Sequence, residues 1–486
     1  MLFNSFGFLV FFPIVTLVYF LIPQRIKYLW LLLASYYFYM CWNPEYAVLI
    51  FISTAVTFLS GILISRSKTA RAKKWAVFGS FAINLGILFL FKYFYFMVDN
   101  VNAVRTVLNL PEIAPKFDII LPVGISFYTF QALSYTVDVY RGEVKPEKNF
   151  LKYALFVSFF PQLVAGPIER SKNLLSQVNE KHYFDYLRVR RGLFVMLWGF
   201  FLKLVIADRA AILVNTVYDN IPAFSGFGIV AATVCFALQI YCDFASYSKI
   251  AIGAAEVMGF RLMENFKRPY FAASISDFWR RWHISLSSWF RDYLYIPLGG
   301  NRKGTYRTYL NLMIVFLTSG LWHGASWHFV IWGAVHGLYQ IIGSATKTVR
   351  ERFRKMIGLG DKNPVYVIFS RVMTFVLVSF AWIFFRSANL KEALEAIHRI
   401  FALFGGKMNV SELGIDVPNL VVLLVSVFVL FVVSLWEEKD EKALEKTEKS
   451  NFAVRWTVYL LLIFAVLIFG IYGSEYEASQ FIYFQF

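Results

Sequence analysis

The chain has 486 residues, of which 58 % are hydrophobic, and a formal net charge of +17. Its mean hydropathy of +0.56 excludes a soluble globular protein of this length, which needs more polar surface. Continuous apolar runs, without the alternating polarity of barrel strands, predict an all-α polytopic membrane protein. Lys and Arg cluster in short loops beside these runs, so the charge indicates membrane topology and not nucleic-acid binding.

Four apolar runs open the chain and predict its first membrane spans. They are 7–22, 28–42, 46–65 and 75–98. Basic residues follow the first run (Arg25 and Lys27) and the third, so the positive-inside rule places the N-terminus outside the cell and 100–117 in an external loop. The next run, 120–140, carries polar side chains that we expect to face the protein interior. These side chains are Gln131, Ser134 and Asp138.

The rest of the chain predicts further spans around one short segment. The run 151–166 contains a proline and precedes a basic loop, so we expect it to be re-entrant or in-plane. Spans are expected at 192–214, 226–258, 365–385, 419–436 and 454–473. An external amphipathic piece is expected at 391–404, and the mixed-charge loop 437–449 is expected to be a solvated helix without chemistry. We predict about ten to twelve transmembrane helices in one domain, 1–473, followed by an extracellular tail, 474–486.

Four of the six histidines lie between 283 and 336, in two neighbouring segments. The first segment, 277–294, predicts an in-plane helix with its aromatic arc toward the acyl region and Arg280 and Arg291 on the side of headgroups or phosphate. The arc consists of Trp279, Trp282, His283, Leu286, Trp289, Phe290 and Tyr293. An interfacial anchor would also explain this pattern, but an anchor does not need His283.

The second segment, 317–337, is apolar enough to lie in a bilayer, and its small residues would let helices approach closely. An imidazole at membrane depth is costly unless it has a function or a partner, and we predict that His323 is the reacting group. We interpret His328 and His336 as packed, hydrogen-bonded side chains. No acidic residue occurs at 293–350, which argues against a metal site and against a carboxylate partner for His323 within this segment. Candidate partners from other helices are Asp138, Asp208 and Asp243.

Several motifs together resemble the membrane-bound O-acyltransferase family, nearest its bacterial branch of alginate O-acetylation proteins and D-alanyl lipoteichoic acid transferases. The two central motifs are DFWRRWHISLSxWFRDY at 277–293 and GLWHGASW at 320–327. The others are FNSxxFLxFFP at the N-terminus, PVGISFYTFQ at 122–131, PQLVAGPI at 161–168 and YCDFASYS at 241–248. The resemblance therefore extends over nearly the whole chain.

This resemblance implies that His323, in the WHG motif, is catalytic and that His283, in the RWH motif, is the second signature histidine. It also implies a funnel through which a cytoplasmic acyl thioester reaches an acceptor on the outer side, without a bound cofactor or metal. The donor would be acetyl-CoA or the phosphopantetheine of an acyl carrier protein. We expect His323 to act as general base, because a neutral imidazole can take a proton from a hydroxyl. The predicted substrate-binding residues are Arg280, Arg291, Trp322 and Asp243.

The chain ends in the aromatic sequence SQFIYFQF at 479–486. Aromatic side chains are unfavourable in water, so we expect this tail to dock against protein or to form an interfacial aromatic belt. The tail also resembles a C-terminal motif of small partner proteins in D-alanylation systems. That resemblance implies that Tyr483 accepts the acyl group and passes it to an extracellular or membrane-anchored transferase.

We therefore predict a bacterial cell-membrane O-acyltransferase, with both termini extracellular, that acetylates a cell-envelope or exported polysaccharide. Its expected partners are membrane lipid, the outer acetyltransferase and a cytoplasmic acyl carrier protein. D-alanyl transfer to teichoic acid is one alternative. A transporter that uses the polar membrane residues Lys203, Asp208, Asp243 and Lys249 without covalent chemistry is another, and a scaffold that recruits partners through its tail is a third.

Overall fold

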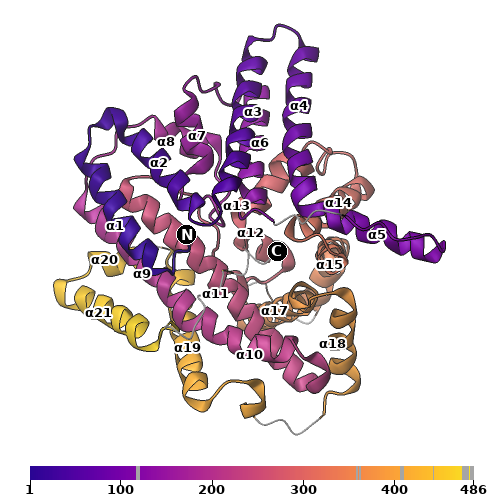
Figure 1. Ribbon diagram of the computed structural model, residues 1–486. Helices are drawn as coiled ribbons and strands as arrows, with labels where there is room; N and C mark the ends of the chain where they lie inside the picture. The colour runs from indigo at the N-terminus through magenta and orange to yellow at the C-terminus, as the bar shows by residue number, and fades with distance from the viewer. Residues whose placement is uncertain are drawn as a thin grey trace. The chain divides into compact units, whose positions relative to one another are not determined.

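The computed structural model describes residues 1–115, 121–356, 360, 363–405, 410–441, 443–472 and 481, and in this part of the chain all regular secondary structure is helical (Figure 1). Six of its helical segments are long and apolar enough to cross a membrane. They are Pro44–Arg66, Ala70–Val107, Gly226–Met258, Pro364–Arg386, Val417–Lys439 and Phe452–Phe469. The predicted all-α class and polytopic membrane architecture are confirmed.

The chain divides into two compact units. Among the described residues, unit 1 comprises Met1–Met196 and Ile250–Met263, and unit 2 comprises Leu197–Lys249 and the residues from Glu264 onward. Two helices, α9 (Tyr186–Phe200) and α11 (Gly226–Met258), have residues in both units.

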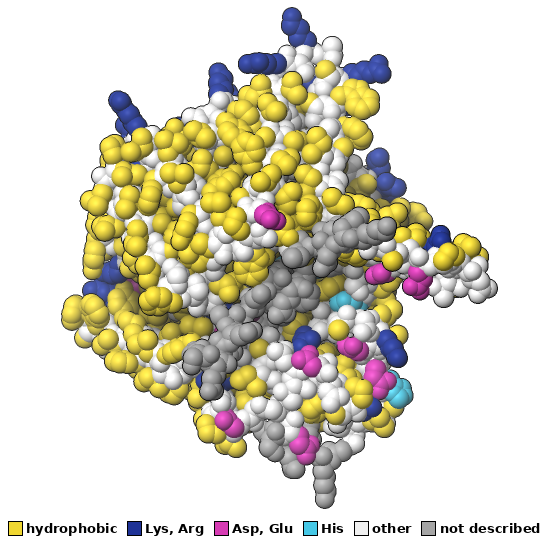
Figure 2. All heavy atoms as spheres, viewed as in Figure 1, with side chains coloured by type: hydrophobic (Ala, Val, Ile, Leu, Met, Phe, Trp, Pro, Cys, Tyr) yellow, Lys and Arg dark blue, Asp and Glu magenta, His cyan; other side chains and the backbone are white. Residues whose placement is uncertain are grey.

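Unit 1 contains the first eight α-helices. They are α1 (Phe6–Leu21), α2 (Lys27–Met40), α3 (Ala47–Arg66), α4 (Ala70–Leu88), α5 (Phe94–Val107), α6 (Ile125–Tyr140), α7 (Phe150–Ser158) and α8 (Ser176–Val178). Shorter turns between them are η1 (Gln24–Ile26), η2 (Pro44–Tyr46), and the π-helical turns η3 (Phe89–Tyr93) and η4 (Ser171–Leu175). Helices α3 and α4 lie side by side as a hairpin (Figure 1). Lys and Arg side chains stand at its tip, whereas its flanks are hydrophobic (Figure 2).

Local sequence sets where several of these helices begin. The hydroxyl of Ser5 accepts a hydrogen bond from the amide of Phe8 at the start of α1, and Thr69 caps α4 in the same way. Such side-chain caps satisfy amide groups that have no partner within the helix.

Helix α6 lies at the centre of unit 1, and 14 of its 16 residues are buried. The polar side chains of Gln131, Ser134 and Asp138 face the protein interior, as predicted. Gln131 donates to the carbonyl of Phe156 at 2.6 Å, and Asp138 accepts from the hydroxyl of Ser171 at 2.9 Å. The ring of Tyr135 packs against that of Tyr153, with centroids 4.5 Å apart. Polar groups on this helix therefore face protein, which avoids the cost of exposing them to lipid.

Two segments of unit 1 bear on the predicted topology. The expectation of an external loop at 100–117 is wrong for residues 100–107, because the helical segment Ala70–Val107 continues through them. Helix α7 has nine residues and ends before Pro161. At 1.5 Å per residue it is about 14 Å long, less than half the hydrocarbon thickness of a bilayer. This length agrees with a segment that does not cross.

Unit 2 contains the remaining helices. They are α10 (Asp208–Tyr218), α12 (Ile275–Arg281), α13 (Ile284–Phe290), α14 (Thr305–His323), α15 (Trp327–Ala345), α16 (Lys347–Met356), α17 (Pro364–Arg386), α18 (Leu390–Ala402), α19 (Val417–Lys439), α20 (Ala443–Lys449) and α21 (Phe452–Phe469). The shorter turns are η5 (Phe201–Ala207), η6 (Ile221–Ala223), η7 (Pro269–Phe271), η8 (Arg291–Tyr295) and η9 (Val410–Leu413).

Helices α14 and α15 form a tightly packed hairpin. A Cβ atom on Gly320 would lie 2.3 Å from the carbonyl oxygen of Phe329, and one on Gly333 would lie 2.2 Å from that of Phe316. The atoms that a Cβ would meet belong to the backbone of the facing helix, which cannot rotate away as a side chain could. A larger residue at either position would therefore force the two helices apart. The prediction that small residues let these helices approach closely is confirmed.

One sequence-based expectation for unit 2 is wrong, and a second is wrong in part. The segment 277–294 is not one in-plane helix, because α12 ends at Arg281 and α13 begins at Ile284. The arc, apart from the half-buried Tyr293, is also buried in protein, with Trp282 at 0 % and Trp279 at 9 % exposure. The segment 437–449, expected to be a solvated helix, is helical over Ala443–Lys449 in α20. It is not solvated throughout, because its first residues continue α19 and Glu438 is held by arginines.

Candidate active site

The break between α12 and α13 is built around His283. This residue has a left-handed backbone, with φ of 44°, a conformation that costs a non-glycine residue about 1–2 kcal/mol. The buried side chain of Asn265 holds the turn from the other side. Its carbonyl oxygen accepts from the amide of Ser285 at 3.2 Å, and its backbone carbonyl accepts from the amide of Ile284 at 3.0 Å. The surrounding structure thus determines where the His283 ring lies.

His323 is the last residue of α14, where the chain leaves the helix through Gly324. A Cβ atom on Gly324 would lie 2.1 Å from the ring of Phe329, so only glycine fits beside the histidine. The space beside Gly324, the glycine of the WHG motif, is therefore filled by the Phe329 ring from α15. It is not open space beside the imidazole of His323, as the small size of glycine could suggest.

Aromatic rings surround the imidazole of His323. Ring centroids lie 4.9 Å away for Trp322, 4.9 Å for Trp332 and 5.4 Å for Phe385. Only 3 % of the His323 surface is exposed. Trp332 comes from α15 and Phe385 from α17, so three helices converge on this side chain. Neither Trp332 nor Phe385 was predicted, because their contribution depends on how α15 and α17 pack.

The two predicted histidines meet in this cluster. The ring centroid of His283 lies 6.3 Å from that of His323 and 5.9 Å from that of Trp322. Complete burial lowers the pKa of His283 to about 3, so this imidazole is neutral at physiological pH. The sequence places these residues 40 positions apart, and the fold brings them together with Trp322.

His328 and His336 are packed, hydrogen-bonded side chains, as the sequence indicates. Nδ1 of His328 lies 2.9 Å from the carbonyl oxygen of Phe384. Nδ1 of His336 accepts a hydrogen bond from the indole of Trp279 at 3.3 Å. In the described part of the chain, no group of three His, Cys, Asp or Glu side chains could hold a metal ion.

The predicted arginines lie on the surface and not in the histidine cluster. Arg280 and Arg291 are both exposed, and Arg291 forms an ion pair with Asp292 at 2.8 Å. Both carry charge that can contact a phosphate at the protein surface, and their role in binding the donor stays a prediction.

Asp243 belongs to a buried ion cluster on η5, α10 and α11. Nζ of Lys203 lies 2.6 Å from the carboxylate of Asp243 and 2.9 Å from that of Asp208. Phe481, from the C-terminal tail, packs against this cluster. It is 1 % exposed, and its ring centroid lies 4.4 Å from Nζ of Lys203. The ring of Tyr247 meets Phe481 edge-on at 4.9 Å. At Phe481 the tail is docked against protein, whereas the predicted relay residue Tyr483 lies outside the described residues.

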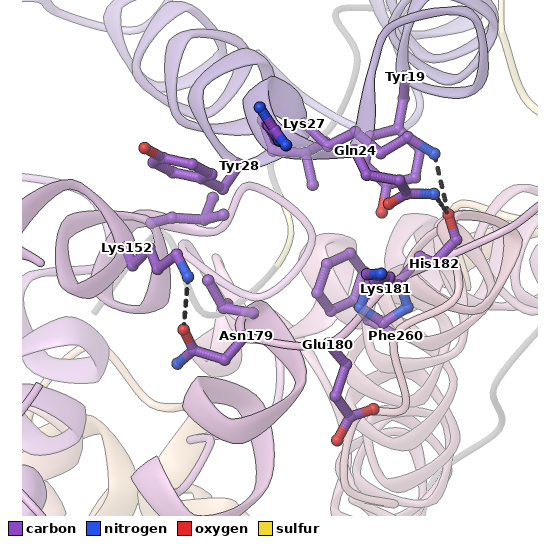
Figure 3. Close-up of a pocket in the computed structure, with 14 residues that line it drawn as sticks. Tyr19, Gln24, Lys27, Tyr28, Lys152, Asn179, Glu180, Lys181, His182 and Phe260 are labelled. Atoms are coloured by element: carbon purple, nitrogen blue, oxygen red, sulfur yellow. Dashed lines mark hydrogen bonds between the residues drawn. The ribbon is translucent and has the colours of Figure 1, made fainter.

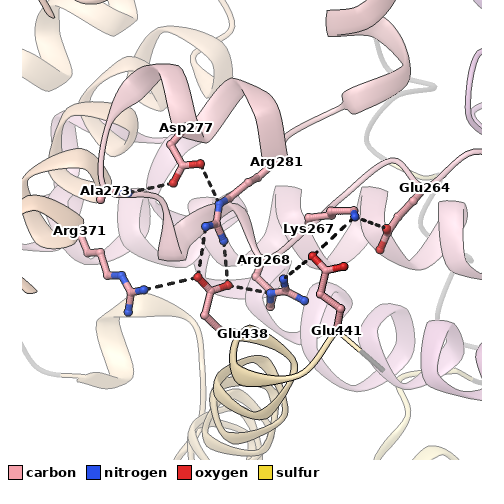
Figure 4. A network of polar contacts seen from close by, with 9 residues as sticks. All are labelled: Glu264, Lys267, Arg268, Ala273, Asp277, Arg281, Arg371, Glu438 and Glu441. Atoms are coloured by element: carbon pink, nitrogen blue, oxygen red, sulfur yellow. Dashed lines mark hydrogen bonds and ion pairs between the residues drawn. The ribbon is translucent and has the colours of Figure 1, made fainter. Parts of the chain in front are cut away.

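The carboxylate of Glu438 anchors the motif that carries His283, and the sequence did not indicate this role. Glu438 accepts from Arg281 at 2.8 and 3.2 Å, from Arg268 at 2.9 Å and from Arg371 at 3.5 Å (Figure 4). Arg281 also bonds Asp277 at 3.1 Å. Because Arg281 lies two residues before His283, these contacts fix one side of the α12–α13 turn.

Comparison with known proteins places this site in a family. The sequence profile of the membrane-bound O-acyltransferase family matches residues 144–386, which include both clustered histidines. The chain is 38 % identical to the probable alginate O-acetylase AlgI of Pseudomonas putida over 100 % of both chains. It is 34 % identical to the peptidoglycan O-acetyltransferase of Helicobacter pylori over 81 % of this chain and 78 % of that one. It is 27 % identical to the teichoic acid D-alanyltransferase of Bacillus subtilis over 56 % of this chain and 70 % of that one. The protein belongs to the membrane-bound O-acyltransferase family and is a multi-pass membrane O-acyltransferase.

Proposed function

We propose that this protein moves an acetyl group from a cytoplasmic thioester donor to a hydroxyl of a cell-envelope or exported polysaccharide, with His323 as general base. The similarity to alginate and peptidoglycan O-acetylases favours acetyl as the group transferred. The observation that carries the proposal is the meeting of His283 and His323, with ring centroids 6.3 Å apart, in one buried cluster built by separate segments.

In the proposed reaction, His323 takes the proton of the acceptor hydroxyl while the hydroxyl oxygen attacks the thioester carbonyl. The tetrahedral intermediate then loses its C–S bond, and the departing thiolate takes the proton from the imidazolium. The products are an O-acetyl ester and a free thiol, so the histidine ends in its starting state. General base catalysis of this kind contributes about 10²–10⁴-fold to the rate.

Burial shapes this chemistry. Because His323 is 3 % exposed, the acyl group and the hydroxyl can reach it only when the neighbouring rings leave a passage. An apolar surrounding would exclude water and so disfavour hydrolysis of the thioester. His283 and Trp322 would position the acyl group beside His323, and the exposed Arg280 and Arg291 would engage the phosphates of acetyl-CoA or of a carrier protein's phosphopantetheine.

The tail would complete transfer on the outer side, with both termini extracellular in a bacterial cell membrane. Tyr483 would accept the acyl group and pass it to an extracellular or membrane-anchored acetyltransferase. The docking of Phe481, the described residue of the tail, beside Lys203 and Tyr247 supports this role for the tail. Tyr483→Phe should abolish polymer acylation while the protein still inserts, and full acylation in this variant would remove the relay.

The identity of the acyl group can be measured directly. Mass spectrometry of cell-envelope polysaccharides, from cells with and without the protein, should show the loss of a 42 Da acetyl increment on hydroxyl groups, as acetyl ester chemistry requires. Loss of D-alanyl esters instead would favour the alternative suggested by the similarity to a teichoic acid D-alanyltransferase. Polysaccharides with unchanged esters would contradict both.

A further inference from the structure

A cavity of about 160 Å³, lined by both charged and apolar side chains, lies within unit 1 (Figure 3). It is bounded by the start of α2, by α7 and by the loop at 178–182. A water molecule occupies about 30 Å³ in the liquid, so the cavity has the volume of about five waters. A phosphate group fits within that volume.

The lining of this cavity is strongly cationic. Arg25, Lys27, Lys152 and Lys181 contribute four positive charges and Glu180 one negative charge, which leaves a formal charge of +3. None of these four cations forms an ion pair with any residue that the structure describes. Among the residues that the structure describes, no ion pair therefore balances this positive charge.

The ammonium group of Lys27 carries its charge in a buried position, which is unfavourable in free energy, because only 6 % of the residue is exposed. Its ammonium group donates to the carbonyl of His182 at 2.9 Å, and that carbonyl also accepts from Gln24 at 2.6 Å. The ring of Tyr19 lies 4.6 Å from the same nitrogen. A carbonyl and an aromatic face stabilise an ammonium ion, but burial of a charge without a counter-ion remains unfavourable. A bound anion would supply the missing charge.

The donors around the cavity favour a ligand with several acceptor oxygens. Lys152 is oriented by its hydrogen bond to Asn179 at 2.7 Å and stands 5.6 Å from the centroid of the Tyr28 ring. Burial lowers the pKa of His182, so its imidazole stays neutral beside the cations and adds no further positive charge. Several ammonium and guanidinium groups in one lining can each donate to a different oxygen of a phosphate group.

We propose that this cavity is a binding site for an anionic phosphate group, carried by a phospholipid headgroup or by a soluble phosphate compound. The loop with Arg25 and Lys27 is predicted to lie on the cytoplasmic side, where membranes carry anionic lipids. The site is independent of the histidine cluster, and its occupancy does not depend on the proposed acetyl transfer.

The test compares purified full-length protein with the double variant Arg25→Gln/Lys181→Gln, whose two side chains are exposed, so that folding is preserved. Arg71→Gln/Lys73→Gln, at the tip of the α3–α4 hairpin, removes the same charge elsewhere as a control. One arm measures thermal stabilisation by inorganic phosphate against chloride at equal ionic strength. The other measures phosphatidylglycerol against phosphatidylcholine in nanodiscs, together with lipid retained in native mass spectra.

Stabilisation by inorganic phosphate would identify a soluble ligand, and stabilisation by phosphatidylglycerol alone would identify a headgroup. In either case the apparent Kd should rise at least about tenfold in Arg25→Gln/Lys181→Gln and stay unchanged in the control. The proposal is overturned when neither probe binds the native protein, or when the control variant weakens binding as much as the cavity variant.

Discussion

The hydrogen bonds between Glu438 and its arginine partners can be tested by Glu438→Gln, which keeps the size of the side chain and removes its charge. The carboxylate accepts three hydrogen bonds from Arg268 and Arg281 within 3.2 Å. Hydrogen bonds to charged groups contribute about 1.5–3 kcal/mol each, and removal of one partner from a buried pair costs about 3–5 kcal/mol. Since 19 % of the Glu438 side chain and 11 % of Arg268 are exposed, we expect a loss of about 2–4 kcal/mol.

Part of this loss should appear at the active site, because Arg281 fixes the turn that carries His283. We expect kcat for acyl transfer to fall at least about tenfold, and the melting temperature in detergent to fall as well. Glu441→Gln is the matched control. Glu441 lies three residues further along, is 71 % exposed and reaches Arg268 only at 4.0 Å, so its loss should cost less than about 1 kcal/mol. Equal stability and equal kcat in the two variants would refute the reasoning.

Three further predictions concern packing, pH and the buried ion cluster. Gly320→Ala should destabilise the protein by at least about 1–3 kcal/mol, since its Cβ would meet a backbone carbonyl at 2.3 Å, whereas Gly343→Ala, with nothing within 4 Å, should be neutral or stabilising in thermal melts. Burial raises the pKa of Glu169 from 4.5 to about 7, so the folded state holds a proton that the unfolded carboxyl releases. The free energy of unfolding should therefore fall by at most about 3 kcal/mol as pH rises from about 5 to 8, and Glu169→Gln should lose this pH dependence. If the variant and the wild type showed the same dependence of stability on pH, this prediction would be contradicted. Lys203→Met should cost about 3–5 kcal/mol in chemical unfolding, because two buried carboxylates lose the cation between them, and a stability within 1 kcal/mol of the wild type would count against the cluster.

Helices with a continuous apolar run could be predicted closely from the sequence. The expected run 226–258 coincides with α11 (Gly226–Met258), and the expected 365–385 lies within α17 (Pro364–Arg386). Length and hydropathy suffice for such helices, because the bilayer requires all backbone groups to bond within the segment. The interior position of the polar residues on α6 could also be predicted, because polar side chains are unfavourable in contact with lipid.

The parts that could not be predicted depend on contacts between distant segments. A helical projection of 277–294 gives a single amphipathic arc. In the structure, the hydrogen bonds of Asn265 to Ser285 and of Glu438 to Arg281 favour a break at His283 over a straight helix. The positive φ of that histidine is not encoded by glycine or asparagine, so no local pattern indicates it. Helix α19 likewise continues through Lys439, because its charged end has arginine partners in the fold.

Of the candidate site residues, His283, Trp322 and His323 are brought together. His283 and His323 are histidines in apolar or aromatic segments, which bilayer packing alone does not explain, and Trp322 is next to His323 in the sequence. Arg280 and Arg291 lie on the surface, and Asp243 forms an ion pair with Lys203. The aromatic neighbours Trp332 and Phe385 resemble ordinary core residues in the sequence, and only their positions around His323 distinguish them.

The most direct measurement of the central claim is thiol release from an acetyl thioester by purified His323→Ala in the presence of a hydroxyl acceptor. His398→Ala, which removes an exposed histidine on α18, is the control for handling and folding. The account predicts that His323→Ala loses at least about 10²-fold in rate while its melting temperature stays close to that of the control. Thiol release at the wild-type rate from folded His323→Ala would contradict it.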